Sequence, residues 1–290
     1  MSPVSKFMYL LLPALWSFGI LATLITGVSS SLSRRAIDHG RIGLDFLSHK
    51  GIPPYRMVQG GVKLRILSVG DSITVGYGQG TDGHSYRLRL RENLANNQVV
   101  WAGTEMNPKG DMQDGYFAAW SGKTIQYIDN KINSSLQQQP NLILVDAGRN
   151  DMNSNLSIAT EGNSPEAAIL RLKSMVEKMI AMCPDATIIL AMPSNVCDSK
   201  QYFRQRERIK VYSSLIAELA EEFRGQMHHV LAADFGPFRQ DMLSDCVHPQ
   251  DVGYLVMGDW WYDFIYQIPK GWIQEPLGSD PNRTGSSHYS

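Results

Sequence analysis

Five short apolar runs alternate along the chain with longer segments in which apolar residues recur every three or four positions. The runs cover residues 65–70, 99–103, 141–148, 186–193 and 228–235, and their nearly continuous apolar character is typical of strands buried on both faces of a parallel sheet. The helical spacing is clearest in residues 166–182 and 203–223, and a last helix is expected over about 250–266. This alternation predicts an α/β fold, a three-layer α/β/α sandwich with right-handed crossovers.

The first 30 residues differ in character from the rest of the chain. Lys6 precedes an uncharged, largely apolar run from Phe7 to Val28, and small residues follow at 29–31. This order is typical of a secretory signal peptide that is cleaved after Ser29 or Ser30. The run is also long enough to span a bilayer as an uncleaved anchor. Either alternative places the remaining chain outside the cell or in the secretory lumen.

Composition and turn residues divide the remaining chain. Residues 31–62 contain Gly and Pro and are expected to form an irregular lead-in to one α/β domain at 63–270, and the polar residues 271–290 are expected to be a disordered tail. The content of 43% hydrophobic and 19% charged residues is ordinary for a packed domain. The net charge of −1 offers no broad basic surface. We therefore expect no nucleic-acid partner and no membrane contact beyond the N-terminal segment.

The three cysteines and three N-glycosylation sequons bear on the compartment. Cys197 and Cys246 follow the fourth and fifth predicted strands, whereas Cys183 precedes the fourth and so lies at the other end of the sheet. Because a disulfide needs Cα atoms within about 7 Å, we expect Cys197 to pair with Cys246 and Cys183 to stay reduced. Three unpaired thiols are the alternative. The sequons at Asn133, Asn155 and Asn282 predict glycosylation.

Candidate catalytic residues follow the carboxyl ends of the predicted strands, where ligands bind in such sheets. Ser72 follows the first strand, Gly103 ends the second and Asn150 follows the third. A backbone N–H at Ser72 or Gly103 and the Asn150 amide could each donate to an oxyanion. Each residue also has an ordinary alternative role, namely a helix N-cap serine, a turn glycine or an Asx turn. Their joint occurrence in successive loops favours catalysis.

Asp245 and His248 follow the fifth predicted strand. Their spacing of three residues places the carboxylate and the imidazole on one side of a tight turn, where Asp245 can accept from one ring nitrogen and leave the other facing a serine hydroxyl. A surface pair at the start of the last helix is the alternative. No other histidine of the seven has an acid at this spacing just beyond a strand.

These motifs together resemble the SGNH (GDSL-type) hydrolase superfamily, from Gly70 to about Tyr254. The matching segments are LRILSVGDSITVGYG (64–78), a block ending WSGKTIQYI (120–128), LILVDAGRNDM (142–152) and DCVHPQDVGY (245–254). Within the superfamily the chain is most similar to the secreted carbohydrate-esterase-like branch of fungi and bacteria.

The resemblance implies a flavodoxin-like, five-stranded parallel sheet in the order 2-1-3-4-5 and a serine esterase that works through an acyl-enzyme. It implies Ser72 as nucleophile, His248 as base and Asp245 as the residue that orients His248. The implied oxyanion donors are the N–H groups of Ser72 and Gly103 and the side chain of Asn150. Two positions depart from the family pattern: Arg149 stands where Thr is usual, and Cys246 stands where Gly is frequent.

The loops on the catalytic face and the resemblance predict short-acyl, chiefly acetyl, esters of a small-molecule or polysaccharide alcohol as substrates. Residues 104–121 and 149–165 are mainly polar and contain no amphipathic helix that could cover a long acyl chain. Tyr77, Tyr116 and Trp120 are candidates for packing against a sugar ring, or else core residues. A lipid-directed esterase and an inactive glycan-binding relative are the alternative functions. Neither a metal nor a cofactor is expected, because no ligand-spaced cluster and no phosphate-binding loop motif occurs.

Overall fold

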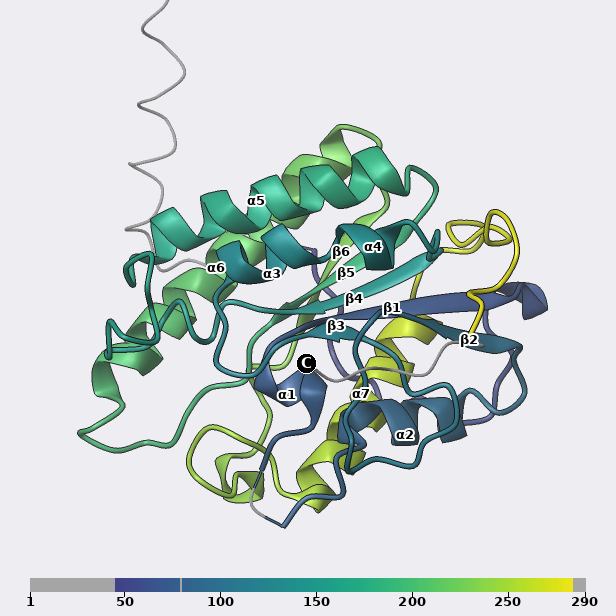
Figure 1. The fold of residues 1–290 in the computed structure, drawn as a ribbon. Coiled ribbons are helices and arrows are strands. Elements are labelled where there is room, and N and C mark those ends of the chain that lie inside the picture. The colour runs from purple at the N-terminus through teal and green to yellow at the C-terminus, as the bar shows by residue number, and fades with distance from the viewer. Residues whose placement is uncertain (1–44, 79, 284–290) are drawn as a thin grey trace, which may run out of the picture. The chain divides into compact units, whose positions relative to one another are not determined.

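A parallel sheet in the order β2-β1-β4-β5-β6 forms the centre of the computed structural model, which describes residues 45–78 and 80–283 (Figure 1). The strands are β1 (Leu64–Gly70), β2 (Val99–Ala102), β4 (Leu142–Asp146), β5 (Thr187–Met192) and β6 (Val230–Asp234). A two-residue strand, β3 (Ala118–Ala119), pairs with the last two residues of β1. The predicted fold class and strand order are therefore confirmed, with β3 as an addition.

Helices cover both faces of this sheet, which explains why its strands are apolar along their whole length. One face carries α3 (Ile125–Lys131), α4 (Asn133–Leu136), α5 (Pro165–Met182) and α6 (Phe203–Gly225), and the other carries α2 (Ser85–Asn93) and α7 (Asp251–Tyr266) (Figure 1). Single turns occur at α1 (Ser72–Val75) and at the 3₁₀ helices η1 (Gln59–Gly61) and η2 (Gln240–Met242). The three predicted helices are thus observed within two residues at each end.

Local sequence signals explain where the long helices start and which side they bury. Ser164 caps α5 by accepting a hydrogen bond from the Ala167 N–H, and Pro165 occupies the first helical position, where its missing N–H costs nothing. In α6 the predicted apolar stripe, which includes Ile209, Ile216 and Phe223, is buried. The sequence did not reveal α2 because that helix is short and buries polar residues and the charged Arg87 among its apolar ones.

The segments flanking the domain are more ordered than their composition suggests. Leu47 pairs in parallel with Ala233 of β6, so part of the lead-in extends the sheet at that edge. Residues 271–283, expected to be disordered, instead contact the protein: the buried Arg65 guanidinium donates to the carbonyl oxygens of Leu277 and Gly278 and to Asp280. The expectation failed because composition does not show that a buried arginine elsewhere needs these acceptors.

Residues 1–44 and 284–290 lie outside the described residues, and with them the expected signal peptide or anchor, the first part of the lead-in (31–44) and the end of the tail. Across residues 45–78 and 80–283, no helix is long and apolar enough to cross a bilayer. The sequon residues Asn133, Asn155 and Asn282 are all exposed. Their glycosylation stays a prediction.

Candidate active site

Ser72 lies at the point where β1 turns into α1. Asp71 caps this turn by accepting a hydrogen bond from the Ile73 N–H at 3.1 Å, so Ser72 is the first residue of the helical turn. Only glycine fits at position 70, because a Cβ there would lie 2.4 Å from Thr74 Oγ1 and 2.5 Å from the Asp146 carbonyl oxygen. The sequence Gly-Asp-Ser therefore sets the nucleophile candidate directly against the end of β4.

The structure brings His248 and Asp245 to Ser72 in one hydrogen-bonded chain. His248 Nε2 lies 2.8 Å from Ser72 Oγ, and His248 Nδ1 lies 2.7 Å from Asp245 Oδ2. The other Asp245 oxygen accepts the backbone N–H groups of Val247 and His248. Burial favours a raised Asp245 pKa, but the hydrogen bonds from His248 and its charge outweigh it and lower that pKa. Asp245 is therefore an ionised acceptor that fixes the orientation of the ring.

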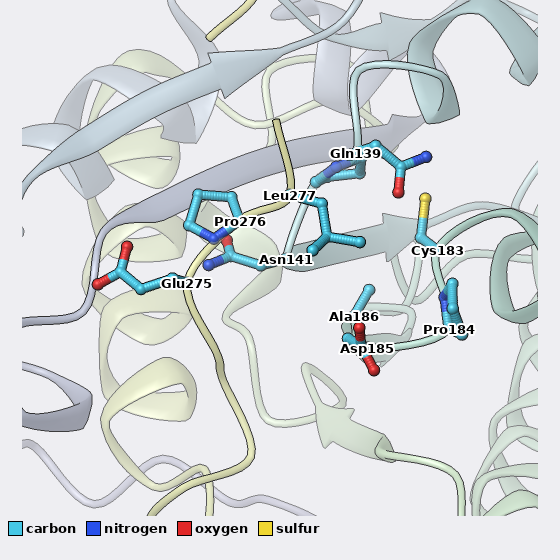
Figure 2. A pocket seen from close by; sticks show the side chains of 10 residues that line it. Gln139, Asn141, Cys183, Pro184, Asp185, Ala186, Glu275, Pro276 and Leu277 are labelled. Atoms are coloured by element: carbon cyan, nitrogen blue, oxygen red, sulfur yellow. The ribbon is translucent and has the colours of Figure 1, made fainter. Parts of the chain in front are cut away.

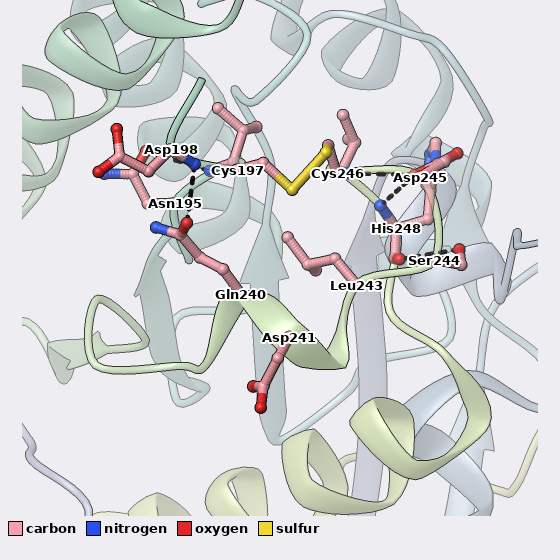
Figure 3. Close-up of a disulfide and its surroundings, with 12 residues drawn as sticks. Asn195, Cys197, Asp198, Gln240, Asp241, Leu243, Ser244, Asp245, Cys246 and His248 are labelled. Atoms are coloured by element: carbon pink, nitrogen blue, oxygen red, sulfur yellow. Dashed lines mark hydrogen bonds and ion pairs between the residues drawn. A yellow bond between two sulfur atoms is a disulfide. The ribbon is translucent and has the colours of Figure 1, made fainter.

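A disulfide anchors the loop that carries these two residues (Figure 3). Cys197, after β5, is bonded to Cys246, and the Cys197 N–H also donates to the Cys246 carbonyl oxygen at 3.1 Å. Cys183 is buried and unpaired, so the predicted pairing is confirmed. Cys246 has a φ of 69°, a left-handed conformation that favours glycine. This conformation explains why glycine is frequent at that position in the superfamily; here the bridge holds a cysteine there instead.

Asn150 also reaches the Ser72 turn. Its Nδ2 donates to the Lys123 carbonyl oxygen at 2.9 Å and, more weakly, to Asp71 Oδ2 at 3.4 Å. The two contacts hold the amide between the start of α1 and the segment before α3. The amide thus lies next to Asp71, the residue that precedes Ser72.

Gly103 does not supply a free donor, and that prediction needs correction. Its N–H donates to Gln138 Oε1 at 2.9 Å, and its carbonyl oxygen accepts from Gln138 Nε2 and from Arg283. A Cβ at this position would lie 2.4 Å from the backbone of Phe117. Glycine is therefore needed at position 103 for close packing of the backbone, which was the ordinary alternative.

Gly122 is the better-placed glycine and was missed as a donor. It lies in the turn closed by Lys123 N–H to the Trp120 carbonyl oxygen, and the Trp120 N–H bonds to the carbonyl oxygen of Gly70, two residues before Ser72. Its φ is 73°, and within the described part of the chain nothing accepts a hydrogen bond from its N–H. The segment WSGKTIQYI (120–128), one of the blocks that carry the family resemblance, contains this glycine and could have pointed to it.

Buried charges lie directly beneath the strand ends. Asp71, Asp146 and Arg149 are each at most 3% exposed. Burial raises the pKa of Asp71 to about 7, against the opposing charge of Arg149, and also raises the pKa of Asp146.

Of the three predicted substrate-contacting aromatics, two lie beside the catalytic residues. The Tyr77 ring is 55% exposed and meets the His248 ring edge-on at 4.7 Å between centroids. Trp120 is half-buried in the turn that bonds to Gly70. Tyr116 is different, because Arg283 covers its ring at 3.5 Å. That contact removes the open aromatic surface on which the prediction for Tyr116 depended.

No group of three or more His, Cys, Asp or Glu side chains within residues 45–78 and 80–283 has the arrangement of a metal site. The side chains that this end of the sheet brings together are a serine hydroxyl, an imidazole, a carboxylate and an amide.

The model of the GDSL-like Lipase/Acylhydrolase family matches residues 68–256, a range that includes Ser72, Asn150, Asp245 and His248. The chain belongs to this family. Its members are ester hydrolases, so the protein is a carboxylic ester hydrolase of the SGNH type. No curated protein sequence matches the chain significantly.

Solved carbohydrate esterases share the fold at low sequence identity. A family 3 carbohydrate esterase from Clostridium thermocellum is 23% identical with a TM-score of 0.55, and the match covers 69% of this chain and 94% of that one. One from Talaromyces cellulolyticus is 18% identical, with the same TM-score and coverage. The acetylxylan esterase Axe2 from Geobacillus stearothermophilus, as a catalytic mutant, is 18% identical with a TM-score of 0.54 over 74% of this chain and 98% of that one. At these identities the likeness shows the fold alone.

Proposed function

We propose that this GDSL-family hydrolase removes short acyl groups, chiefly acetyl, from carbohydrate alcohols through an acyl-enzyme. The observation that carries the catalytic part is the continuous chain from Ser72 Oγ through His248 to Asp245, with contacts of 2.8 and 2.7 Å. Glycan binding without catalysis does not require a nucleophile, a base and an ionised orienting group in hydrogen-bond contact.

In the proposed mechanism, Ser72 Oγ attacks the ester carbonyl carbon while His248 Nε2 accepts the hydroxyl proton. Asp245 accepts from Nδ1–H and stabilises the imidazolium that forms. The tetrahedral intermediate collapses as the leaving alcohol takes the proton from Nε2 and an acyl-serine remains. Water then attacks the acyl-serine and gives a proton to His248 Nε2. The second tetrahedral intermediate collapses as Ser72 Oγ takes that proton back, which releases the acid and restores the serine hydroxyl.

The proposed oxyanion donors are the N–H groups of Ser72 and Gly122 and the amide of Asn150. Preorganised donors of this kind stabilise the charge that develops on the carbonyl oxygen. The Asn150 Nδ2–H shared with Asp71 makes a long hydrogen bond of 3.4 Å, so it can be given up to an oxyanion at small cost.

Features of the catalytic face support the choice of a small acyl group on a sugar. Residues 104–117 and 149–164 contain no helix, so these loops provide no apolar lid. Binding of a long acyl chain depends on an apolar surface that buries it, with each buried CH₂ contributing about 0.8 kcal/mol. The exposed Tyr77 ring beside His248 can pack against a sugar ring on the alcohol side. The structural neighbours described as carbohydrate and acetylxylan esterases agree with this choice.

The deciding experiment compares kcat/KM on 4-nitrophenyl acetate, butyrate and octanoate and then on acetylated xylo-oligosaccharides, with Ser72→Ala as the background. We expect acetate to exceed octanoate and the acetylated sugar to exceed the simple acetate. A preference for octanoate would move the protein to the lipid-ester branch. Equal rates on simple and sugar acetates would remove the carbohydrate part alone, and binding of glycans without acid release would indicate the inactive relative.

We also propose that the protein is secreted through residues 1–30. The Cys197–Cys246 disulfide supports this, because such bonds persist in oxidising compartments. N-terminal sequencing of protein from the culture medium tests it: a start at residue 30 or 31 indicates cleavage, and an intact residue 1 on membrane-bound protein indicates the anchor. Mobility after endoglycosidase treatment tests the three sequons.

A further inference from the structure

Asp151 is a buried acid that directly follows Asn150 in the loop after β4. Its side chain is 0% exposed. Oδ1 accepts hydrogen bonds from both Nε and Nη2 of Arg171 on α5, at 3.1 and 2.9 Å. Oδ2 accepts the backbone N–H of Ile125 at 3.0 Å. Asp151 thus joins three segments, namely the loop that carries Asn150, the helix α5 and the start of α3.

The bond from Ile125 caps the helix α3. Ile125 is the first residue of this helix, and an N–H at that position has no acceptor within its own helix. Thr124, at the N-cap position, makes no capping hydrogen bond with its side chain. The Asp151 carboxylate supplies the missing acceptor from 26 residues further along the chain. The start of α3 is therefore fixed by a residue of the catalytic loop.

A second hydrogen bond joins the same two segments through the neighbouring residues. Asn150 Nδ2 donates to the Lys123 carbonyl oxygen at 2.9 Å, and Lys123 lies two residues before Ile125. This bond uses one of the two hydrogens of the amide and leaves the other for an oxyanion. The direction of that free hydrogen depends on where the Lys123 carbonyl oxygen lies, and this depends on where α3 begins.

We propose that Asp151 is a positioning residue for Asn150: its carboxylate, held by Arg171, fixes the start of α3 and with it the Lys123 carbonyl oxygen that orients the amide. The inference rests on the proposed oxyanion role of Asn150 and adds a residue to it. Because Arg171 and Ile125 occupy its two oxygens, Asp151 acts through Asn150 and not on the substrate.

A second ion pair between α3 and α5 provides the matched control. Lys178 Nζ of α5 lies 2.7 Å from Asp129 Oδ1 of α3. Asp129 is 8% exposed and lies one helical turn beyond Ile125. Loss of this pair weakens the packing of α3 against α5 but leaves the cap at Ile125 in place. The control therefore separates general packing from the position of the first turn.

The test measures kcat and KM on 4-nitrophenyl acetate, with a thermal melt for each variant. Asp151→Ala/Arg171→Met removes the buried pair as a whole and leaves no unpaired charge. We expect it to lower kcat by about 10- to 100-fold and to leave KM within about twofold, because a displaced donor is lost in the transition state. If this variant does not fold, Asp151→Leu/Arg171→Met, which fills the space of the carboxylate, takes its place with the same expected result.

Two further variants separate the cap from the ion pair. Asp151→Asn/Arg171→Met keeps a side-chain oxygen that can accept the Ile125 N–H, so we expect it to recover most of the wild-type kcat. Asp129→Ala/Lys178→Met should lower the melting temperature and keep kcat within about twofold of the wild type. An equal loss of kcat in this control, or no recovery in the asparagine variant, overturns the inference.

A final comparison combines the changes with Asn150→Ala. In that background Asp151→Ala/Arg171→Met should lower kcat by less than about threefold, because the group that it positions is already absent. The same factor in both backgrounds, or a wild-type kcat in the alanine variant, overturns the inference and leaves the esterase mechanism standing. A wild-type kcat in Asn150→Ala overturns the oxyanion role on which the inference rests, and activity retained in Ser72→Ala overturns the mechanism itself.

Discussion

The two ends of the sheet use polar residues in opposite ways. At the carboxyl ends of the strands lie Ser72, the proposed nucleophile, and Asn150 and Gly122, the proposed oxyanion donors. At the amino ends, Asn141 is 4% exposed and fully bonded: its oxygen accepts the Arg65 N–H, and its amide donates to the carbonyl oxygens of Lys63 and Gln274. The first end holds the groups proposed to act on an ester, and at the second end Asn141 is bonded internally.

The C-terminal segment explains why the amino end is closed. Pro276 and Leu277 run beside Asn141 and Cys183 (Figure 2), and the carbonyl oxygen of Trp272 accepts from Thr187 at the start of β5. The Trp272 ring also stacks on His229 with 4.5 Å between centroids. Residues 271–280 thus cover the amino end of the sheet. We expect changes at one end to affect turnover and changes at the other to affect stability.

Replacement of the nucleophile should give the largest effect. Ser72→Ala removes the atom that attacks the ester, so kcat should fall by about 1,000-fold or more. Folding should be intact, because the Asp71 cap on the Ile73 N–H does not use the serine hydroxyl. Initial rates on 4-nitrophenyl acetate and a thermal melt check both parts. Substantial residual turnover would mean that the catalytic end has been misassigned.

Removal of the oxyanion amide comes next. Asn150→Ala should lower kcat by about 100- to 1,000-fold with little change in KM, because the donor acts on charge that develops in the transition state. The control is Asn153→Ala in the same loop, whose side chain accepts from the Asn155 N–H and touches no catalytic group. Equal losses in the two variants would show that loop order, and not the amide, limits the rate.

The disulfide belongs to the catalytic end but should affect both properties. Its cysteines are 49 residues apart, so opening it in Cys197→Ala/Cys246→Ala should cost about 4 kcal/mol of unfolding free energy by chain entropy. Turnover should fall as well, since Asp245 and His248 lie next to Cys246. Urea unfolding and steady-state rates are measured on the same preparations. The control is Cys183→Ala, which removes the unpaired cysteine and leaves the disulfide in place. Lost stability at unchanged kcat would show that the bridge does not position the catalytic loop.

The smallest effect on turnover should come from the amino end. Asn141→Ala leaves the Arg65 N–H and two carbonyl oxygens without their partner and should reduce the unfolding free energy by about 3 kcal/mol. The rate constant of the remaining folded protein should match the wild type. Asn130→Ala, an exposed amide on α3, should change stability by less than about 0.5 kcal/mol. A loss of kcat in Asn141→Ala would contradict the expectation that changes at the amino end affect stability and leave turnover unchanged.

The sequence by itself determined the α/β class, the strand order through the superfamily resemblance, and the positions of Ser72, Asp245, His248 and Asn150. The fold class and these positions depend on short-range signals, namely apolar runs, helical spacing and residues placed just past a strand. Such signals can be read directly from the sequence. The cysteine pairing followed in the same way, because the position of each cysteine relative to a strand fixes the end of the sheet on which it lies.

Only the tertiary structure decided what each glycine, aromatic ring and charge is used for. Gly103 and Gly122 both end or follow apolar segments, but the Gly103 N–H is taken by Gln138, 35 residues further along the chain. Tyr116 and residues 271–283 were misjudged because their partners, Arg283 and Arg65, are distant in sequence. The same holds for the surroundings of Arg149, which is buried and lies 3.5 Å from Asp146 Oδ1. Contacts between distant residues decide such roles, and no local pattern encodes them.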